Sequence, residues 1–225
     1  MTDLHPQVAA QLAELAIQVG RPLVVSDADE VLFAFMASFE RYLNRRGLIF
    51  DWSSFALTGN VRERGSNAAL PAPAVRDHLA AFFENHTEDI APVAGAREAL
   101  AELGRAAQIV VLSNLPLAQR AARQRALSHH GMDFPLIANI GLKGPAVRAL
   151  SDRARAPAVF IDDIPHNHSS VAAAAGAVWR LHMVADPRLA RLLDRAPDSH
   201  ARIDTWPEDA PVLAARLGIA GAAPV

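Results

Sequence analysis

The sequence predicts an α/β fold, a doubly wound and mostly parallel sheet with helices on both faces, to which a small α-helical cap is added. Short apolar segments, such as residues 22–25 and 108–112, carry no polar alternation and are typical of strands buried on both faces. Helical patterns of about 10–15 residues separate these segments. Right-handed crossover connections then place helices on both faces of the sheet.

The predicted strands follow one another along the chain with a helix between most of them. They cover residues 22–25, 108–112, 135–137, 158–161 and 177–181. An N-terminal helix is expected over residues 6–19, because Pro6 suits a first helical turn and Gly20 stops the apolar periodicity. The other expected helices cover about residues 32–46, 73–86, 94–104, 116–130, 144–155, 167–175, 187–195 and 208–217.

Residues 33–90 interrupt this alternation directly after the first strand. The stretch contains two amphipathic helical patterns, separated by breakers that include Gly59 and Gly65, and it shows no convincing strand. We therefore expect an α/β catalytic core formed by residues 1–32 and 91–225, with a helical cap at residues 33–90 inserted after the first strand.

The composition excludes several classes of protein. The chain of 225 residues is 51% hydrophobic and has a net charge of −2, which argues against a disordered protein and against a nucleic-acid binder with a basic face. It has no cysteine, so disulfides, cysteine zinc sites and thiolate nucleophiles are excluded. No segment approaches about 18 consecutive apolar residues, and the N-terminus lacks a signal-peptide pattern, so we expect a soluble cytoplasmic protein without a membrane partner. The oligomeric state stays open between monomer and homodimer.

Polar residues stand directly after three of the predicted strands. They are Asp27 and Asp29, Ser113 and Asn114, and Asp162 and Asp163. Ligands of an open parallel sheet bind outside the carboxyl ends of its strands, so we expect these side chains in one crevice. Clustered carboxylates repel one another unless a cation holds them together. A set of oxygen ligands without cysteine favours Mg²⁺.

Lys143 is the only lysine of the chain, beside 21 arginines. A codon bias that replaces lysine by arginine wherever the choice is neutral explains such a ratio. The remaining lysine is then expected where arginine does not serve, because a compact ammonium and a wide planar guanidinium fit different sites.

Four segments together resemble the sequence motifs of the haloacid-dehalogenase-like hydrolase superfamily. Residues 23–32, with an Asp-x-Asp after an apolar strand, resemble the first motif, and residues 109–114 resemble the second, which ends in a serine or threonine. Lys143 resembles the third motif, and residues 159–163 resemble the fourth in its paired-aspartate form. The match runs over residues 23–183 in the order of the family, so the combination is much more specific than any single motif.

The resemblance implies a Mg²⁺-dependent phosphomonoester hydrolase that acts on a small phosphorylated metabolite. Asp27 would be the nucleophile that forms an aspartyl-phosphate. Asp29 would protonate the leaving oxygen and then activate a water molecule. Lys143 would neutralise the Asp27 carboxylate and a phosphate oxygen.

The same resemblance assigns the remaining strand-end residues to binding. Ser113 would donate a hydrogen bond to the phosphoryl group, with the amide of Asn114 close by. The Mg²⁺ ligands would be the Asp27 carboxylate, the Asp29 carbonyl, and Asp162 or Asp163 or both.

Two further groups have both a functional and a structural interpretation. Arg62 and Arg64 lie in a loop between glycines, and they either contact an anionic substrate or remain exposed beside Glu63. His166 and His168 follow the acidic pair at a spacing that suits a transition-metal site. Because no third nitrogen or sulfur ligand is evident, we favour a position beside the crevice for them.

The chain departs from the family pattern at Glu30, where glycine is common, and at Val31, where threonine is frequent. Glu30 adds a negative charge near a site for an anion, which motivates a second hypothesis of a non-catalytic ligand- or partner-binding protein with the same fold. A phosphotransferase, a mutase and a dehalogenase stay open as well, although Asp29 favours phosphate-ester chemistry. Motifs of P-loop NTPases, dinucleotide-binding enzymes, zincins and α/β-hydrolases are absent from the sequence.

Overall fold

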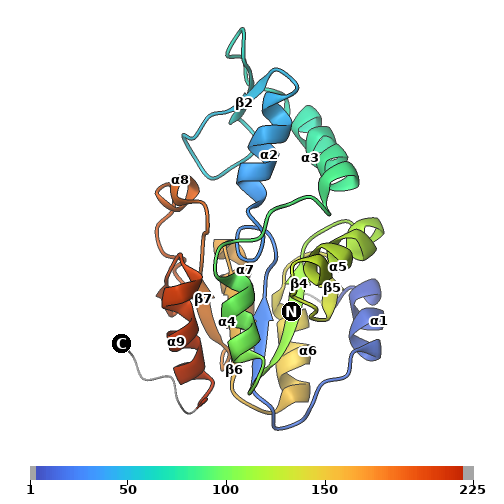
Figure 1. The fold of residues 1–225 in the computed structure, drawn as a ribbon, viewed down its shortest axis with the longest axis vertical. Coiled ribbons are helices and arrows are strands. Elements are labelled where there is room, and N and C mark those ends of the chain that lie inside the picture. Colours follow the sequence, from blue (N-terminus) through green and yellow to red (C-terminus); the bar gives the residue numbers. More distant parts are fainter. Residues whose placement is uncertain (1–3, 220–225) are drawn as a thin grey trace.

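A six-stranded parallel sheet forms the centre of the protein (Figure 1). The computed structural model describes residues 4–219. The strands lie in the order β5-β4-β1-β6-β7-β8. They are β1 (Leu23–Ser26), β4 (Gln108–Ser113), β5 (Leu136–Ala138), β6 (Ala158–Asp162), β7 (Trp179–His182) and β8 (Ala201–Arg202). The predicted α/β fold with a doubly wound parallel sheet is therefore confirmed.

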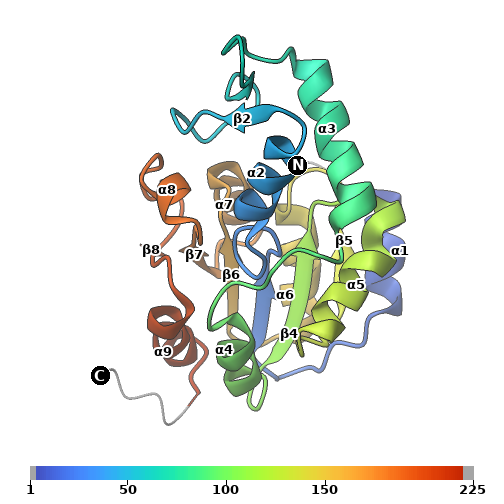
Figure 2. The same cartoon turned by 45° about the horizontal axis from the view of Figure 1, so that its top comes forward.

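Successive side chains of the strands enter two hydrophobic cores, one on each face of the sheet. In β1, Val24 packs into one core, whereas Leu23 and Val25 pack into the other. Because both faces are covered, β1, β5 and β6 contain no polar residue before their last position. The helices on the Leu23 side are α1 (Pro6–Glu14), α6 (Gly144–Ala154) and α7 (Pro165–Ala174). Those on the Val24 side are α4 (Ala96–Leu103), α5 (Arg120–His129) and α9 (Trp206–Arg216) (Figure 2).

Residues 33–90, which we call the inserted segment, lie beyond the carboxyl ends of the strands (Figure 1). Their elements are α2 (Phe35–Asn44), β2 (Leu48–Phe50), β3 (Val61–Glu63) and α3 (Ala72–His86). The expectation that this segment contains no strand is wrong, because β2 and β3 form an antiparallel pair in which Phe50 lies opposite Val61. Strands of three residues are too short to show a period of two in the sequence.

Two predicted helices end earlier than expected, and a further strand, β8, was not predicted. Helix α1 ends at Glu14, and Val19 is 70% exposed, so burial does not favour a longer helix. Helix α8 (Pro187–Ala190) ends where the Arg202 guanidinium donates hydrogen bonds to the carbonyl groups of Ala190 and Leu193. Arg202 itself belongs to β8, a strand of two residues that the sequence pattern does not reveal. A short 3₁₀ helix, η1 (Leu117–Gln119), precedes α5.

Among the described residues, the structure contains no helix with the length and hydropathy that a membrane span requires.

Candidate active site

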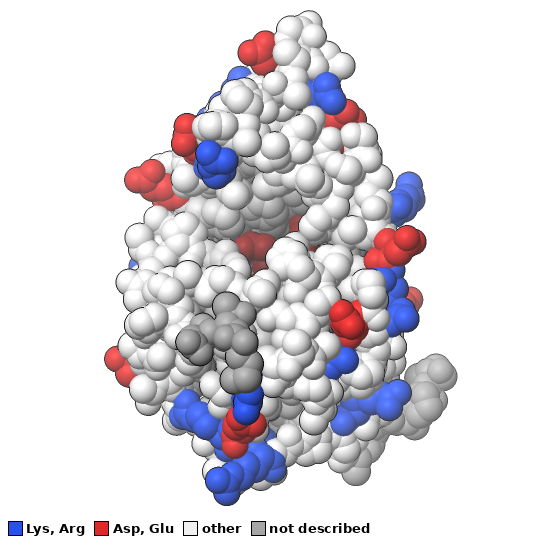
Figure 3. All heavy atoms as spheres, turned by 180° about the vertical axis from the view of Figure 1, so that it is seen from behind, with Lys and Arg blue, Asp and Glu red and all other residues white. Residues whose placement is uncertain are grey.

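A cavity of about 300 Å³ lies between the carboxyl ends of the strands and the inserted segment. Figure 3 shows it as a hollow with acidic side chains in its depth. The polar residues that line it are Asp27, Asp29, Glu30, Asn114, Lys143, Asp163, His166 and Asn167. The three strand ends that were expected to meet are indeed adjacent, because β1 lies between β4 and β6 in the sheet.

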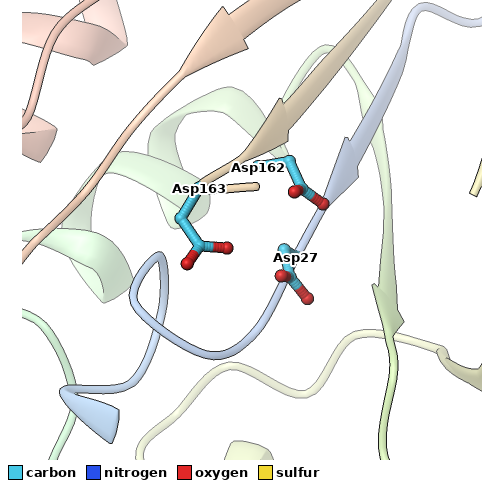
Figure 4. Close-up of side chains that lie close together, drawn as sticks. All are labelled: Asp27, Asp162 and Asp163. Carbon is cyan, nitrogen blue, oxygen red and sulfur yellow. The ribbon is translucent and has the colours of Figure 1, made fainter. Parts of the chain in front are cut away.

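Three carboxylates converge at this end of the sheet, Asp27 after β1 and Asp162 and Asp163 at the end of β6 (Figure 4). One oxygen from each lies within 4.8 Å of the others, and all three residues are buried. Burial raises the pKa of Asp27 to about 7, and the negative charges of Asp162 and Asp29 add to this effect. Burial and the charge of Asp162 also raise the pKa of Asp163 well above its usual range. These carboxylates are therefore held together at a free-energy cost that a bound cation relieves.

Lys143 supplies one positive charge to this cluster. Its Nζ lies 2.7 Å from Asp27 Oδ1 and 2.6 Å from Asp162 Oδ2. Although burial acts in the opposite direction, the charges of Asp162 and Asp27 raise the pKa of Lys143 above its ordinary value, so it is a cation at neutral pH. Lys143 directly precedes α6, and Gly144 lets that helix start against α7, because a Cβ there would lie 2.3 Å from the carbonyl oxygen of Ser170.

The two aspartates at the end of β6 differ in their hydrogen bonds. Asp162 Oδ1 accepts hydrogen bonds from the backbone N–H of Ile164 and from the Asn167 amide, and Oδ2 accepts from Lys143. Among the described residues, no hydrogen bond reaches the carboxylate of Asp163, which lines the cavity. Asp162 therefore holds Lys143 in place, whereas the oxygens of Asp163 could accept a metal ion or another donor.

The arrangement fits a hard divalent cation. The available donors are oxygens, and Asp27 and Asp163 bring two carboxylates to the same side of the cavity. Mg²⁺ is commonly held by one or two carboxylates together with water molecules and substrate phosphate oxygens. Among the described residues, Lys143 is the only lysine or arginine that lines the cavity. The carboxylates around it therefore leave an excess of negative charge, which a divalent cation would neutralise.

The Asp29 side chain forms an ion pair that the sequence did not indicate. Arg123 of α5 donates from Nη2 to Asp29 Oδ1 at 2.8 Å. The Arg123 side chain is fully buried, and its guanidinium lies over the ring of Phe33, 4.7 Å from the ring centroid. Asp29 is 21% exposed at the cavity, so one face of its carboxylate is accessible to a ligand.

Ser113 and Asn114 end β4 beside β1. The Ser113 hydroxyl is buried and has no hydrogen-bond partner among the described residues. Such an orphaned donor is unusual in a folded protein. Ser113 itself is not among the residues that line the cavity. Asn114 lines the cavity, where its amide donates to the Gly141 carbonyl and accepts from Asn139.

Glu30, the residue that departs from the family pattern, is held by two backbone groups. Its Oε1 accepts from the N–H of Met36 in α2 at 2.6 Å, and its Oε2 accepts from the N–H of Asp186 at 2.9 Å. Its φ of 58° explains why glycine suits this position, because left-handed backbone is strained for other residues. Burial raises the pKa of Glu30 to about 7. Glu30 therefore connects the inserted segment to the loop before α8.

The structure does not bring the two cap arginines to the cavity. Arg62 pairs with Asp51 at 3.1 Å, and Arg64 donates a hydrogen bond to Asn44. Both lie in or beside the β2–β3 hairpin, and neither lines the cavity. A contact of Arg62 or Arg64 with a substrate therefore has no support in this arrangement.

The two histidines after the acidic pair occupy different positions. His166 lines the cavity, whereas His168 is fully buried with its Nε2 3.0 Å from the carbonyl oxygen of Asp162. Burial lowers the pKa of His168, so the ring is neutral near pH 7. Only His166 therefore lies beside the crevice, as expected, whereas His168 supports the end of β6.

Two site residues escaped the sequence analysis. Arg123 lies on the buried side of α5, three and four residues before buried Ala126 and Leu127, and a charged residue on an apolar stripe is the signal that could have marked it. Asn167 stands five residues after Asp162 in the first turn of α7. Asparagine is common at helix starts, so no comparable signal marked it.

Comparison with solved structures identifies the fold. A haloacid-dehalogenase-family hydrolase from Deinococcus radiodurans R1, solved with bound phosphate and sodium, is 16% identical with a TM-score of 0.58, over 88% of this chain and 96% of its own. The haloacid-dehalogenase-like hydrolase SP0104 from Streptococcus pneumoniae is 11% identical with a TM-score of 0.54, over 83% and 95% of the two chains. A mutant of CbbY from Rhodobacter sphaeroides, in complex with xylulose-(1,5)bisphosphate, is 18% identical with a TM-score of 0.51, over 84% and 96%.

No family model and no curated protein matches the sequence, so the structural likeness at low identity establishes the fold. Three of the four motifs lie at the carboxyl ends of β1, β4 and β6, and Lys143 directly precedes α6. The chain therefore has the fold of the haloacid-dehalogenase-like hydrolases, as the motifs indicated.

Proposed function

We propose that this protein is a Mg²⁺-dependent phosphomonoester hydrolase that acts on a small phosphorylated metabolite through an aspartyl-phosphate. The observation that carries the proposal is the contact of Lys143 Nζ with both Asp27 and Asp162, in a cavity that Asp163 also lines. The buried ammonium and the acidic cluster together suit a phosphoryl group, which needs positive charge on several oxygens.

The catalytic steps are assigned to two aspartates. Asp27 attacks phosphorus, and the bond between phosphorus and the ester oxygen breaks as the Asp27–phosphorus bond forms. Asp29 gives its proton to the departing ester oxygen, and then accepts a proton from the water that hydrolyses the aspartyl-phosphate. Lys143 stabilises the charge on the transferring oxygens, and the unpartnered hydroxyl of Ser113 donates to one of them, beside the Asn114 amide.

The Asp27 carboxylate, the Asp29 carbonyl and the Asp163 carboxylate would hold Mg²⁺. Asp162 serves mainly through its hydrogen bonds to Lys143 and Asn167. When bound, the ion neutralises phosphoryl oxygens in the transition state. The inserted segment acts as a cap that limits the size of the substrate and shields the cavity from bulk water.

Release of phosphate from p-nitrophenyl phosphate in the presence of Mg²⁺ tests the proposal. We expect activity in the wild type and a loss of at least about a thousandfold in Asp27→Asn, because the nucleophile is removed. Asp152→Asn is the matched control, since Asp152 is exposed and pairs with Arg148 on the surface of α6. Absence of turnover over a broad panel of phosphate esters, with Mg²⁺ bound, would instead favour a non-catalytic binding protein.

The other enzymatic alternatives give different products. A phosphotransferase or mutase would transfer the phosphoryl group to an acceptor other than water, and a dehalogenase would release halide. The presence of Asp29 in the cavity supports ester hydrolysis, because a departing alkoxide needs a proton donor. The two backbone hydrogen bonds of Glu30 give that residue a structural role that is compatible with catalysis.

A further inference from the structure

The upper wall of the cavity is apolar, in contrast to its acidic floor. Residues from the inserted segment and from α8 form this wall: Phe35 and Met36 of α2, Phe55 and Leu57 of the loop after β2, Leu79 and Phe83 of α3, and Leu189. We call this set the apolar wall. It faces the position where the part of a substrate beyond its phosphoryl group would lie.

Aromatic packing holds part of the apolar wall in place. The Phe35 ring stacks on Phe83 with centroids 5.7 Å apart, and on Phe39 with centroids 5.5 Å apart. Phe39 is fully buried in the core of the inserted segment. The wall is therefore an extension of a packed core, and a ligand group that fills the cavity contacts surfaces that are already ordered.

The charges around the cavity exclude a second anionic group. Within residues 4–219, Lys143 is the only lysine or arginine that lines the cavity, and Asp27 and Asp162 already engage it. The arginines next to lining residues are already paired, Arg123 with Asp29 and Arg188 with Asp186 and Glu40. Those of the β2–β3 hairpin contact Asp51 and Asn44. The carboxylates that line the floor repel any anion beyond the one that Mg²⁺ and Lys143 neutralise.

We propose that the substrate is a monoester with one phosphoryl group and an uncharged, mainly apolar alkyl or aryl alcohol part. This inference rests on the proposed function and narrows its substrate class. Burial of apolar groups against the wall supplies the binding energy, whereas a carboxylate, a second phosphate or a sugar with many hydroxyls would lose hydration without finding partners there. A volume of about 300 Å³ at the lower end of small-molecule sites suits a single ring or a short chain.

A homologous series of n-alkyl phosphates from ethyl to hexyl tests the inference. We expect kcat/KM to rise about fourfold for each added methylene until the cavity is filled. Hexyl phosphate is also compared with a phosphate ester of the same six-carbon length whose far end is a carboxylate. For this charged ester we expect kcat/KM to be lower by about tenfold or more. A flat series, or equal rates for the two six-carbon esters, overturns the inference while the phosphatase proposal stands.

Binding of the corresponding alkylphosphonates, measured by calorimetry with Mg²⁺ present, separates the two proposals. If no ester is hydrolysed but affinity rises with chain length and falls with a terminal carboxylate, the phosphatase proposal fails and the inference about the site holds. If affinity is independent of chain length, the inference fails whatever the turnover.

A substitution that places a positive charge in the apolar wall provides a second test. Leu79 lies half-buried in the apolar wall on α3, and Leu79→Arg places a guanidinium there. We expect the preference for hexyl phosphate over its carboxylate analogue to fall by about tenfold or more. Arg76→Leu, at an exposed position one turn earlier in α3, is the matched control and leaves the ratio unchanged. If circular dichroism shows that Leu79→Arg does not fold, Leu57→Arg in the loop replaces it, and an unchanged ratio in the folded variant contradicts the inference.

Discussion

Arg123 donates a hydrogen bond from Nη2 to Oδ1 of Asp29 at 2.8 Å, from a side chain that is fully buried. Its Nε and Nη1 have no hydrogen-bond partner among the described residues. A guanidinium buried with two unsatisfied nitrogens is costly, so its contact with Asp29 is the feature that accounts for its position. Because Arg123 engages Oδ1, the other carboxylate oxygen of Asp29 is left to carry the proton in the proposed reaction.

Arg123→Met separates this positioning role from stability. We expect kcat to fall by about 10- to 100-fold with little change in KM, because Asp29 loses its orientation. The free energy of unfolding should change by less than about 1.5 kcal/mol, because methionine fills the space and removes the unsatisfied nitrogens. Arg125→Met, two residues further and exposed beside Glu88, is the matched control, and a kcat that is unaffected in Arg123→Met would contradict the role.

Lys143→Arg tests whether the site needs an ammonium. The side chain is fully buried between Asp27 and Asp162, with both contacts at 2.7 Å or less, and a planar guanidinium does not fit that geometry. We expect phosphate release to fall by about 100-fold or more although the charge is kept. Arg148→Lys on the exposed face of α6 makes the reverse exchange and should leave the rate unchanged. Full activity of Lys143→Arg would show that charge alone suffices.

Glu30→Gln tests the connection between the inserted segment and the loop before α8. The two carboxylate oxygens accept from separate backbone N–H groups, and glutamine offers only one acceptor oxygen. One buried N–H then faces an NH₂ group, so we expect the free energy of unfolding in urea to fall by about 1–3 kcal/mol. Glu84→Gln on the exposed side of α3 is the control, and equal stability of the two variants would argue against this role.

Asp209 makes stability depend on pH. It is fully buried in α9, its carboxylate has no hydrogen-bond partner among the described residues, and burial raises its pKa to about 8. A carboxyl group with a raised pKa contributes its full stability below about pH 4, where it is protonated in both states, and loses it as pH rises towards 8. The free energy of unfolding of Asp209→Asn, relative to that of the wild type, should therefore rise by about 2–5 kcal/mol between pH 4 and pH 8, as measured by unfolding in urea. A stability difference that is constant with pH would contradict this shift.

Removal of the metal and of Asp163 should have matching effects on thermal stability. Mg²⁺ at about 100 times its Kd stabilises a binding protein by about 2.7 kcal/mol, which corresponds to a rise in Tm of several degrees. We expect this rise in the wild type and in the surface control Asp152→Asn, and its loss in Asp163→Asn or after addition of a chelator. A Mg²⁺-dependent rise in Tm that persists in Asp163→Asn would show that Asp163 does not bind the ion.

Local sequence was sufficient for five strands of the central sheet, β1 and β4 to β7, and for the polar residues at their ends. A strand buried on both faces is apolar along its length, so its carboxyl end is visible as the first polar residue. This residue is Ser26 in β1 and Asp162 in β6, directly before Asp27 and Asp163. The parallel order of the sheet then brings those ends together without further information. The β2–β3 hairpin was not predictable in the same way, because strands of three residues are too short to show a period of two in the sequence.

The sequence by itself therefore determined the α/β fold and the acidic site with its single lysine, since these follow from periodicity and from residue type at strand ends. Tertiary structure alone decided which groups surround that site. Arg123 reaches Asp29 across 94 positions of sequence, Arg62 turns to Asp51, and the apolar wall comes from four separate segments. Such contacts depend on how helices and loops pack, and packing is a property of the folded chain that no local pattern records.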